Sequence, residues 1–177
     1  MKRKKLPHQF TRTKGMLLFT PNSDNIKEAF ERSEKLGVLP NSFTRGTGRM
    51  TGFLGEVAFE VLYPKSTYVG GEIYSHDYVI GNRTIDIKSK TCSSKPQPHY
   101  TASVNCPKGK KLLAKAYFFV RVRKDFTRAW MLGWAATQKI QKVGVYKKRG
   151  EPDEFGFTYK VDGYHLPISE LRPANSL

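Results

Sequence analysis

The segment HDYVIGNRTIDIKSK, residues 76–90, contains two runs of β-favouring residues on either side of Gly81-Asn82. Gly-Asn is a good two-residue hairpin loop, because glycine at the first central position suits a type II′ turn. A two-residue loop at 81–82 also fixes which residues face one another across the two strands. The predicted pairs are Ile80 with Arg83, Tyr78 with Ile85, and Asp77 with Asp86.

The predicted hairpin has one apolar face and one polar face, since side chains alternate along a strand. The apolar face is expected to lie in the core and carries Tyr78, Ile80, Ile85 and Ile87. The polar face carries Asp77, Thr84, Asp86, Lys88 and Lys90.

Asp77 and Asp86 are the unusual members of the polar face, because directly opposed carboxylates lie about 5 Å apart at Cβ and repel each other. Solvent exposure, a neighbouring lysine, a shared proton or a divalent cation would each offset this repulsion. An ordinary half-buried strand with a solvated face has the same alternation, with Lys88 neutralising Asp86. The residues alone leave these alternatives open.

Two helices are predicted before the hairpin. The first opens at the pair Asn25-x-x-Glu28, which has the pattern of a helix cap, and ends at Gly37. Residues 39–49 follow as a loop, because Gly and Pro interrupt any periodicity there.

The second helix is predicted over 51–62, with Thr51 as its cap and Pro64 as its stop. The residues at helical spacing are Phe53, Leu54, Val57, Ala58, Val61 and Leu62. Glu56 falls in the second turn, on the flank of this apolar face. Gly52 and Gly55 lie about one turn apart and are expected to let the helix approach other backbone closely.

The rest of the chain is rich in strand patterns. The expected strands are 67–73, 76–80, 83–90, 99–105, 116–123 and 129–136. AYFFVRV and AWMLGWA, within the last two ranges, predict a hydrophobic hairpin at the centre of a sheet. Core positions are expected for Phe118, Phe119, Trp130 and Trp134, and a short helix is expected over 107–115.

The charge of the chain bears on its partners. It has 31 lysines and arginines against 15 aspartates and glutamates, a formal net charge of +16 and a pI near 9.9. Such an excess attracts polyanions, which favours nucleic acid and leaves acidic membranes and acidic proteins as alternatives. Residues 1–14 are expected to form a basic flexible arm, and residues 15–177 a single domain.

Two cysteines, Cys92 and Cys106, are too few for the four-ligand sets of structural zinc or iron–sulfur sites. The basic start is followed by a short apolar run at 16–19, which is too short for a signal peptide or a membrane span. We therefore expect reduced thiols, a cytoplasmic location and no membrane association.

The order of these features resembles the PD-(D/E)XK nuclease superfamily, and most of all its small phage-encoded endonucleases. The segments that carry the resemblance are GFLGEVAFEVLYP with Glu56, HDYVI with Asp77, and TIDIKSK with Asp86 and Lys88. YFFVRV, MLGWAA and YHLPISELRP are similar to the downstream strands and tail of the phage proteins. His76 stands where the family motif has proline, and Asp86 where glutamate is commoner.

The resemblance implies an α/β (α+β) fold, in which a mixed central β-sheet is flanked by helices around a restriction-endonuclease-like core. It also implies hydrolysis of phosphodiester bonds with Mg2+, for which Mn2+ would substitute. The implied metal ligands are Glu56, Asp77, Asp86 and the carbonyl of Ile87, and the implied catalytic residues add Lys88 and Lys90. The chemistry of Mg2+ agrees, because this ion takes one or two carboxylates together with waters and substrate phosphate oxygens.

The expected function is therefore a metal-dependent nuclease acting on nucleic acid, foremost a DNA endonuclease, in the host cytoplasm if it is phage-encoded. A homodimer is an option, since many nucleases dimerise to cut both strands. The phosphate-contact candidates, each with a solvated loop as the alternative, are Lys108, Lys110, Lys111, Lys147, Lys148 and Arg149. The alternative function is a nucleic-acid-binding or interaction module that keeps the fold without catalysis.

Overall fold

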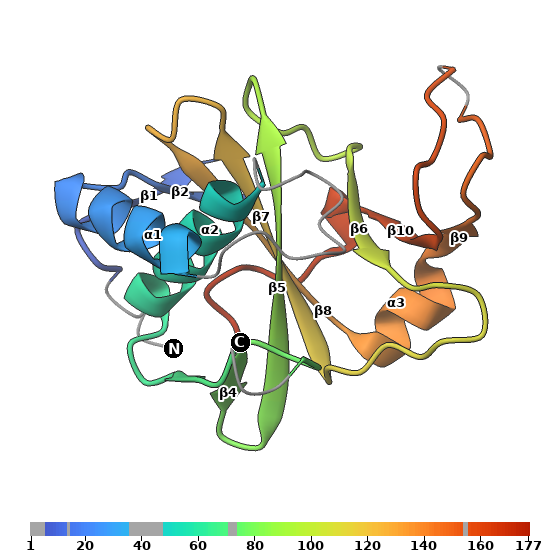
Figure 1. Ribbon diagram of the computed structural model, residues 1–177, viewed down its shortest axis with the longest axis horizontal. Helices are drawn as coiled ribbons and strands as arrows, with labels where there is room; N and C mark the ends of the chain where they lie inside the picture. The colour runs from blue at the N-terminus through green and yellow to red at the C-terminus, as the bar shows by residue number, and fades with distance from the viewer. Residues whose placement is uncertain (1–5, 14, 36–47, 71–73, 154–155) are drawn as a thin grey trace.

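The computed structural model describes residues 6–13, 15–35, 48–70, 74–153 and 156–177 (Figure 1). Within these residues, seven strands form a mixed sheet in the order β1-β2-β8-β7-β5-β4-β3. They are β1 (Phe10–Thr13), β2 (Met16–Phe19), β3 (Thr67–Tyr68), β4 (Tyr78–Ile80), β5 (Arg83–Cys92), β7 (Ala116–Arg123) and β8 (Ala129–Ala136). β5 and β7 pair in parallel, and the other neighbours pair antiparallel.

A smaller sheet packs beside the main one. It contains β6 (Thr101–Asn105), β10 (Gly163–Pro167) and β9 (Val145–Lys147), in that order. The helices are α1 (Ser23–Lys35), α2 (Arg49–Leu62), α3 (Thr137–Val143) and a 3-10 turn over Ile168–Glu170. In Figure 1, α1 and α2 lie on one side of the main sheet, and the small sheet and α3 lie on the other. The predicted α+β class, with a mixed sheet flanked by helices, is confirmed.

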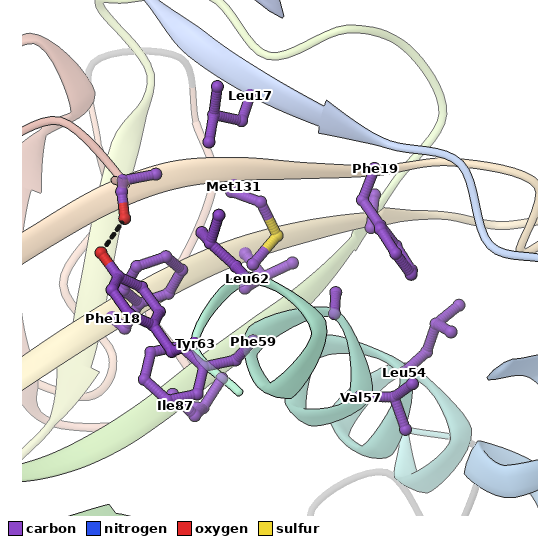
Figure 2. Close-up of a cluster of buried hydrophobic side chains, with 14 of the residues drawn as sticks. Leu17, Phe19, Leu54, Val57, Phe59, Leu62, Tyr63, Ile87, Phe118 and Met131 are labelled. Atoms are coloured by element: carbon purple, nitrogen blue, oxygen red, sulfur yellow. Dashed lines mark hydrogen bonds between the residues drawn. The ribbon is translucent and has the colours of Figure 1, made fainter. Parts of the chain in front are cut away.

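β7 is the central strand of the fold, because it is buried on both faces. Phe118 and Val120 belong to the core cluster on the α2 side, and Tyr117 and Phe119 to the cluster beneath the small sheet and α3. Figure 2 shows the first cluster, in which α2 contributes Leu54, Val57, Phe59 and Leu62. The predicted core positions of Phe118, Phe119, Trp130 and Trp134 are confirmed.

The hairpin forms with the predicted register. Tyr78 pairs with Ile85 and Ile80 pairs with Arg83, and Gly81 has a φ of 58°, which suits glycine. Tyr78 and Ile85 are fully buried, so the apolar face lies in the core as expected. β5 continues two residues beyond the prediction, because Thr91 and Cys92 still pair with β7.

α2 begins two residues earlier than predicted, at Arg49, and Gly48 occupies the N-cap position. The predicted cap at Thr51 is therefore wrong. Thr51 is buried within the helix, where its Oγ1 lies 3.1 Å from Oγ1 of Thr91 on β5. This contact between helix and strand accounts for a threonine at the position.

The two glycines of α2 differ in their surroundings. A Cβ at Gly55 would lie 2.0 Å from Ser89 Oγ and 3.1 Å from Ser89 Cβ, whereas a Cβ at Gly52 would meet nothing within 4 Å. The expected close approach therefore holds for Gly55, where α2 crosses β5, and is wrong for Gly52.

We expect Gly55→Ala to lower the free energy of unfolding by about 1–3 kcal/mol, because α2 or β5 must shift to admit the methyl group. Gly52→Ala is the matched control, and it should raise the free energy of unfolding by up to about 1 kcal/mol, since alanine favours a helix. Urea denaturation of both variants measures the difference. A Gly55→Ala protein as stable as the native chain would contradict the α2–β5 contact.

The N-terminal segment joins the main sheet. Residues 10–13, which the sequence places in a flexible basic arm, form β1 and pair with β2. Phe10 is 5% exposed, and its ring centroid lies 5.0 Å from that of Phe19. The arm prediction is wrong for residues 10–13 because this buried aromatic anchors them; residues 1–5 and 14 lie outside the described ranges.

α1 starts at Ser23, upstream of the predicted cap. Asn25 N donates to Asn22 Oδ1 at 2.9 Å, and Asn22 N donates to Asn25 Oδ1 at 3.1 Å. This reciprocal pair does the work of a capping box, so the cap predicted at Asn25 is wrong and Asn22 takes that position. The predicted stop at Gly37 lies outside the described residues.

Residues 107–115 do not form the predicted helix. Backbone N–H groups of this segment donate to side chains of the main sheet instead. Leu113 N and Ala114 N donate to the hydroxyl of Tyr117, and Lys115 N donates to Thr84 Oγ1. The strand predicted over 67–73 forms over Thr67–Tyr68, and residues 71–73 lie outside the described ranges. α3 is a helix that the sequence did not predict.

Candidate functional site

Asp77 lies directly before β4 and is tied to β5 through both backbone and side chain. Its N–H donates to the carbonyl of Ile85 at 2.9 Å, and its Oδ2 accepts the N–H of Ile87 at 2.7 Å. Burial, and then the charge of Asp86, raise the pKa of Asp77 to about 7. The two carboxyl groups therefore interact, although Asp77 lies just outside the residues of β4 that pair with β5.

Lys88 contacts Asp86 directly, with 2.6 Å between Nζ and Oδ2. The Asp86 side chain is only 15% exposed, so the pair is partly shielded from solvent. Burial alone would lower the pKa of Lys88, but the charge and hydrogen bond of Asp86, together with the charge of Asp77, outweigh burial and raise it. Lys88 thus neutralises Asp86, whereas its charge is only a minor influence on the pKa of Asp77.

Glu56 brings a third carboxylate from the second turn of α2. Its Oε2 is buried and has no hydrogen-bond partner among the described residues. Burial, and then the charge of Asp77, raise the pKa of Glu56 to about 8, and Asp86 adds a smaller effect in the same direction. The charges of Asp77 and Asp86 therefore both act on the carboxyl group of Glu56.

Glu60, one turn further along α2, is in the opposite situation. Arg32 donates to its Oε1 at 2.9 Å and to its Oε2 at 2.8 Å, and the hydroxyl of Tyr78 donates to Oε1 at 2.7 Å. The negative charge of Glu60 is thus fully offset within the protein. Of the two acidic side chains, Glu56 is the one that still needs a positive partner.

The chemistry of these three side chains, though not their grouping in the structure, is of the kind that divalent cations prefer. Glu56, Asp77 and Asp86 supply carboxylate oxygens, which hard cations such as Mg2+ and Mn2+ prefer. A positive ion would also relieve both the burial and the mutual repulsion that raise the two pKa values. Within the described ranges, no three His, Cys, Asp or Glu side chains are grouped so that they could hold a metal ion.

The backbone of Ile87 lies at the site, since its N–H donates to Asp77. Its carbonyl as a metal ligand stays a prediction. Lys90 does not join the carboxylates, because its Nζ donates to Ser103 Oγ on β6. The structure thus joins Asp86 to Lys88, places Asp77 and Glu56 within electrostatic range of Asp86, and directs Lys90 toward the small sheet.

The predicted phosphate-contact lysines divide into two groups. Lys110 and Lys111 line a cavity of about 330 Å³ together with Asp86 and Lys88. Of the other candidates, Lys147 ends β9, and Lys108 and Arg149 lie near each other, because Asp162 accepts the backbone N–H of both. Among the candidates, all of which the structure describes, only the first group lines this cavity with residues of the candidate site.

Sequence reasoning missed the residues that support the site from α1 and β4. Arg32 and Tyr78 hold Glu60, and Arg32 also donates to Glu28 at 2.5 Å. The signal available was the spacing of Glu56 and Glu60, which places both acids on one helix face. Which of the two is neutralised depends on a contact between α1 and α2, and no local pattern shows it.

No protein-family model matches the chain, and no curated protein matches it. None of the helices in the described part of the chain combines the length and the apolar character needed to cross a bilayer.

Proposed function

We propose that the chain is a metal-dependent nuclease of the PD-(D/E)XK type that hydrolyses phosphodiester bonds. The observation that carries this proposal is the buried, unpartnered Oε2 of Glu56. Burial, then the charge of Asp77 and, to a smaller extent, that of Asp86 raise the pKa of Glu56, and Lys88 contacts Asp86. Buried carboxylates gathered without enough protein cations favour a bound metal ion.

The residues have distinct roles in this proposal. Asp77, Asp86 and the carbonyl of Ile87 hold the ion, and Glu56 completes its shell or orients the attacking water. Mg2+ or Mn2+ supplies a Lewis acid that lowers the pKa of water and offsets phosphoryl charge. Lys88 donates to the phosphate or to the water, where its positive charge stabilises the negative charge that develops during reaction.

Nucleic acid is the proposed partner, and DNA the proposed substrate. The net charge of +16 favours a polyanion, and Lys110 and Lys111 line the same cavity as Asp86 and Lys88. We propose that the protein works in the cytoplasm as a homodimer that cuts both strands.

Cleavage of plasmid and oligonucleotide DNA tests the proposal. We expect products with Mg2+ or Mn2+, none with EDTA, and none from Asp86→Ala in any condition. Glu170→Ala is the matched control, because this acid pairs with Lys139 on an exposed surface; it should cleave like the native chain. Equal activity of the native chain with EDTA, or of Asp86→Ala with Mg2+, would contradict the proposal.

One contact favours a second function, nucleic-acid binding without catalysis. The Lys88–Asp86 ion pair at 2.6 Å neutralises Asp86 with no metal ion. If the chain is only a binding module, it should bind DNA, fail to cleave it, and melt at the same temperature with and without Mg2+.

A further inference from the structure

A second cluster of like charges lies further along β5. Lys90 pairs with Arg121 of β7 in the parallel register, and both line one small cavity together with Lys88. Lys90 Nζ donates to Ser103 Oγ, and Arg121 Nη2 donates to the carbonyl of Thr101 at 2.8 Å. Among the described residues, neither cation forms an ion pair with an acidic side chain.

The arrangement of these two cations is unfavourable by itself. Burial, and then the charge of Arg121, lower the pKa of Lys90 to about 8, and burial lowers the pKa of Arg121. The cluster is the counterpart of the carboxylates around Glu56: there a cation is needed, and here an anion. A phosphate would relieve the repulsion and form charge-assisted hydrogen bonds with both side chains.

A cavity with matching chemistry lies next to this pair. Its volume is about 530 Å³, and its lining comprises Gly48, Arg49, Thr51, Ser89, Lys90, Thr91 and Arg121. Three cationic side chains and three hydroxyl side chains line it, and none of its lining residues in the described part of the chain is acidic. The first turn of α2, which borders the cavity, also carries no acidic residue, and the amino end of a helix favours anions.

We propose that Lys90, Arg121 and Arg49 bind a second backbone phosphate of the strand whose scissile phosphate lies at Asp86 and Lys88. This inference rests on the proposed nuclease function. Lys90 lies four residues beyond Asp86 on one strand face, about 13 Å at the rise of a β-strand. Phosphates of one duplex strand are separated by the winding of the strand as well as by its rise of about 3.4 Å per nucleotide along the axis, so a separation of about 13 Å corresponds to about two nucleotides.

The substrate is therefore a polynucleotide that continues past the cleaved bond on the Lys90 side. A mononucleotide ester or a single terminal phosphate would leave the second cluster without its anion. The Lys90–Arg121 cluster thus selects for strand length and places the bond to be cut at a fixed distance from a phosphate contact.

Binding of a fluorescein-labelled 20-nucleotide DNA strand in EDTA, where a metal-dependent cleavage is absent, tests this site. We expect Lys90→Met/Arg121→Met to raise Kd about 10- to 100-fold at low salt and to reduce the slope of log K against log salt by about 1–2. Lys27→Met/Lys35→Met removes two exposed lysines of α1; this control should change Kd less than about threefold. An unchanged Kd and slope in the first variant would overturn the proposal.

A strand with one neutral methylphosphonate linkage locates the contact. For the native chain, one or two adjacent positions should weaken binding, and in Lys90→Met/Arg121→Met the same positions should have no effect. Lys90→Met alone keeps the Arg121–Thr101 bond and should give a partial loss if the double variant folds poorly. The same positional profile in native and variant chains would also overturn the proposal.

The outcome is separable from that of the nuclease proposal. If the native chain never cleaves DNA but shows the Lys90-dependent phosphate contact, the result would support this site and contradict the nuclease proposal. If the native chain cleaves DNA with Mg2+ but Lys90→Met/Arg121→Met binds DNA equally well, the result would support the nuclease proposal and contradict this site.

Discussion

Replacing Glu56 with glutamine is expected to stabilise the metal-free protein at pH 8 by about 2–4 kcal/mol. The reason is that burial and the charge of Asp77 make an ionised Glu56 unfavourable, and raise its pKa from 4.5 to about 8. Glutamine has nearly the same shape and no charge. Thermal or urea unfolding in EDTA measures the gain in stability. Mg2+ should make this gain smaller, because it stabilises the native chain and not Glu56→Gln.

The pH dependence of this gain follows from the two pKa values. Below pH 4.5 the carboxyl is protonated in both the folded and unfolded chain, so it costs nothing. Between pH 4.5 and 8 the unfolded chain releases the proton that the folded chain keeps, so the native protein loses stability as pH rises. The advantage of Glu56→Gln should therefore grow from near zero at pH 4.5 to its full value at about pH 8.

Glu60→Gln is the matched control on the same helix. Its carboxylate accepts hydrogen bonds from Arg32 and Tyr78, so the substitution should destabilise the protein by about 1–3 kcal/mol. A Glu56→Gln protein that is destabilised like Glu60→Gln would show that Glu56 has a partner and needs no cation.

Replacing Lys88 with methionine is expected to lower the rate of DNA cleavage about 10²- to 10³-fold, because a positioned charge that stabilises developing negative charge is lost. Metal binding should survive, since Lys88 supplies no oxygen ligand. Loss of the 2.6 Å contact with Asp86 should even raise the affinity for Mg2+, because Nζ no longer competes for that carboxylate. Single-turnover cleavage and Mg2+ titration measure the two effects.

Lys115→Met is the charge-matched control for Lys88→Met. Lys115 lies directly before β7 and donates to the carbonyl of Asn82 at the hairpin loop, so the Lys115→Met protein should cleave at close to the native rate. Equal loss of activity in both variants would indicate that net charge, and not the position of Lys88, sets the rate.

The β4–β5 hairpin and β7 are the parts of the fold that the sequence predicts best. Gly81-Asn82 and the alternation around it determine the register of Tyr78–Ile80 with residues 83–85, and the apolar run of β7 marks a strand buried on both faces. These are local patterns with a single physical outcome. Helix starts are predicted less well, because Thr51 contacts Thr91 instead of capping α2, and Asn25 caps α1 only as the partner of Asn22.

The charge balance of the site depends on contacts between distant segments. The spacing along α2 makes Glu56 and Glu60 equivalent, and Arg32 of α1 distinguishes them. The pairing of Lys90 with Arg121 likewise requires the parallel register of β5 and β7, which the predicted strands alone do not specify. Local sequence therefore predicts the carboxylates of the hairpin, whereas tertiary packing decides which other charges remain uncompensated.

The proposed nuclease function depends on one divalent cation lying among the side chains of residues 56, 77 and 86. Melting curves with Mg2+ or Mn2+, against NaCl of equal ionic strength, test it in the native chain and in Asp77→Asn. An ion at 100 times its Kd should stabilise the native chain by about 2.7 kcal/mol, a rise in Tm of about 5–10 °C, and leave Asp77→Asn unchanged. A native Tm that is the same with and without divalent ions would contradict the proposed metal site.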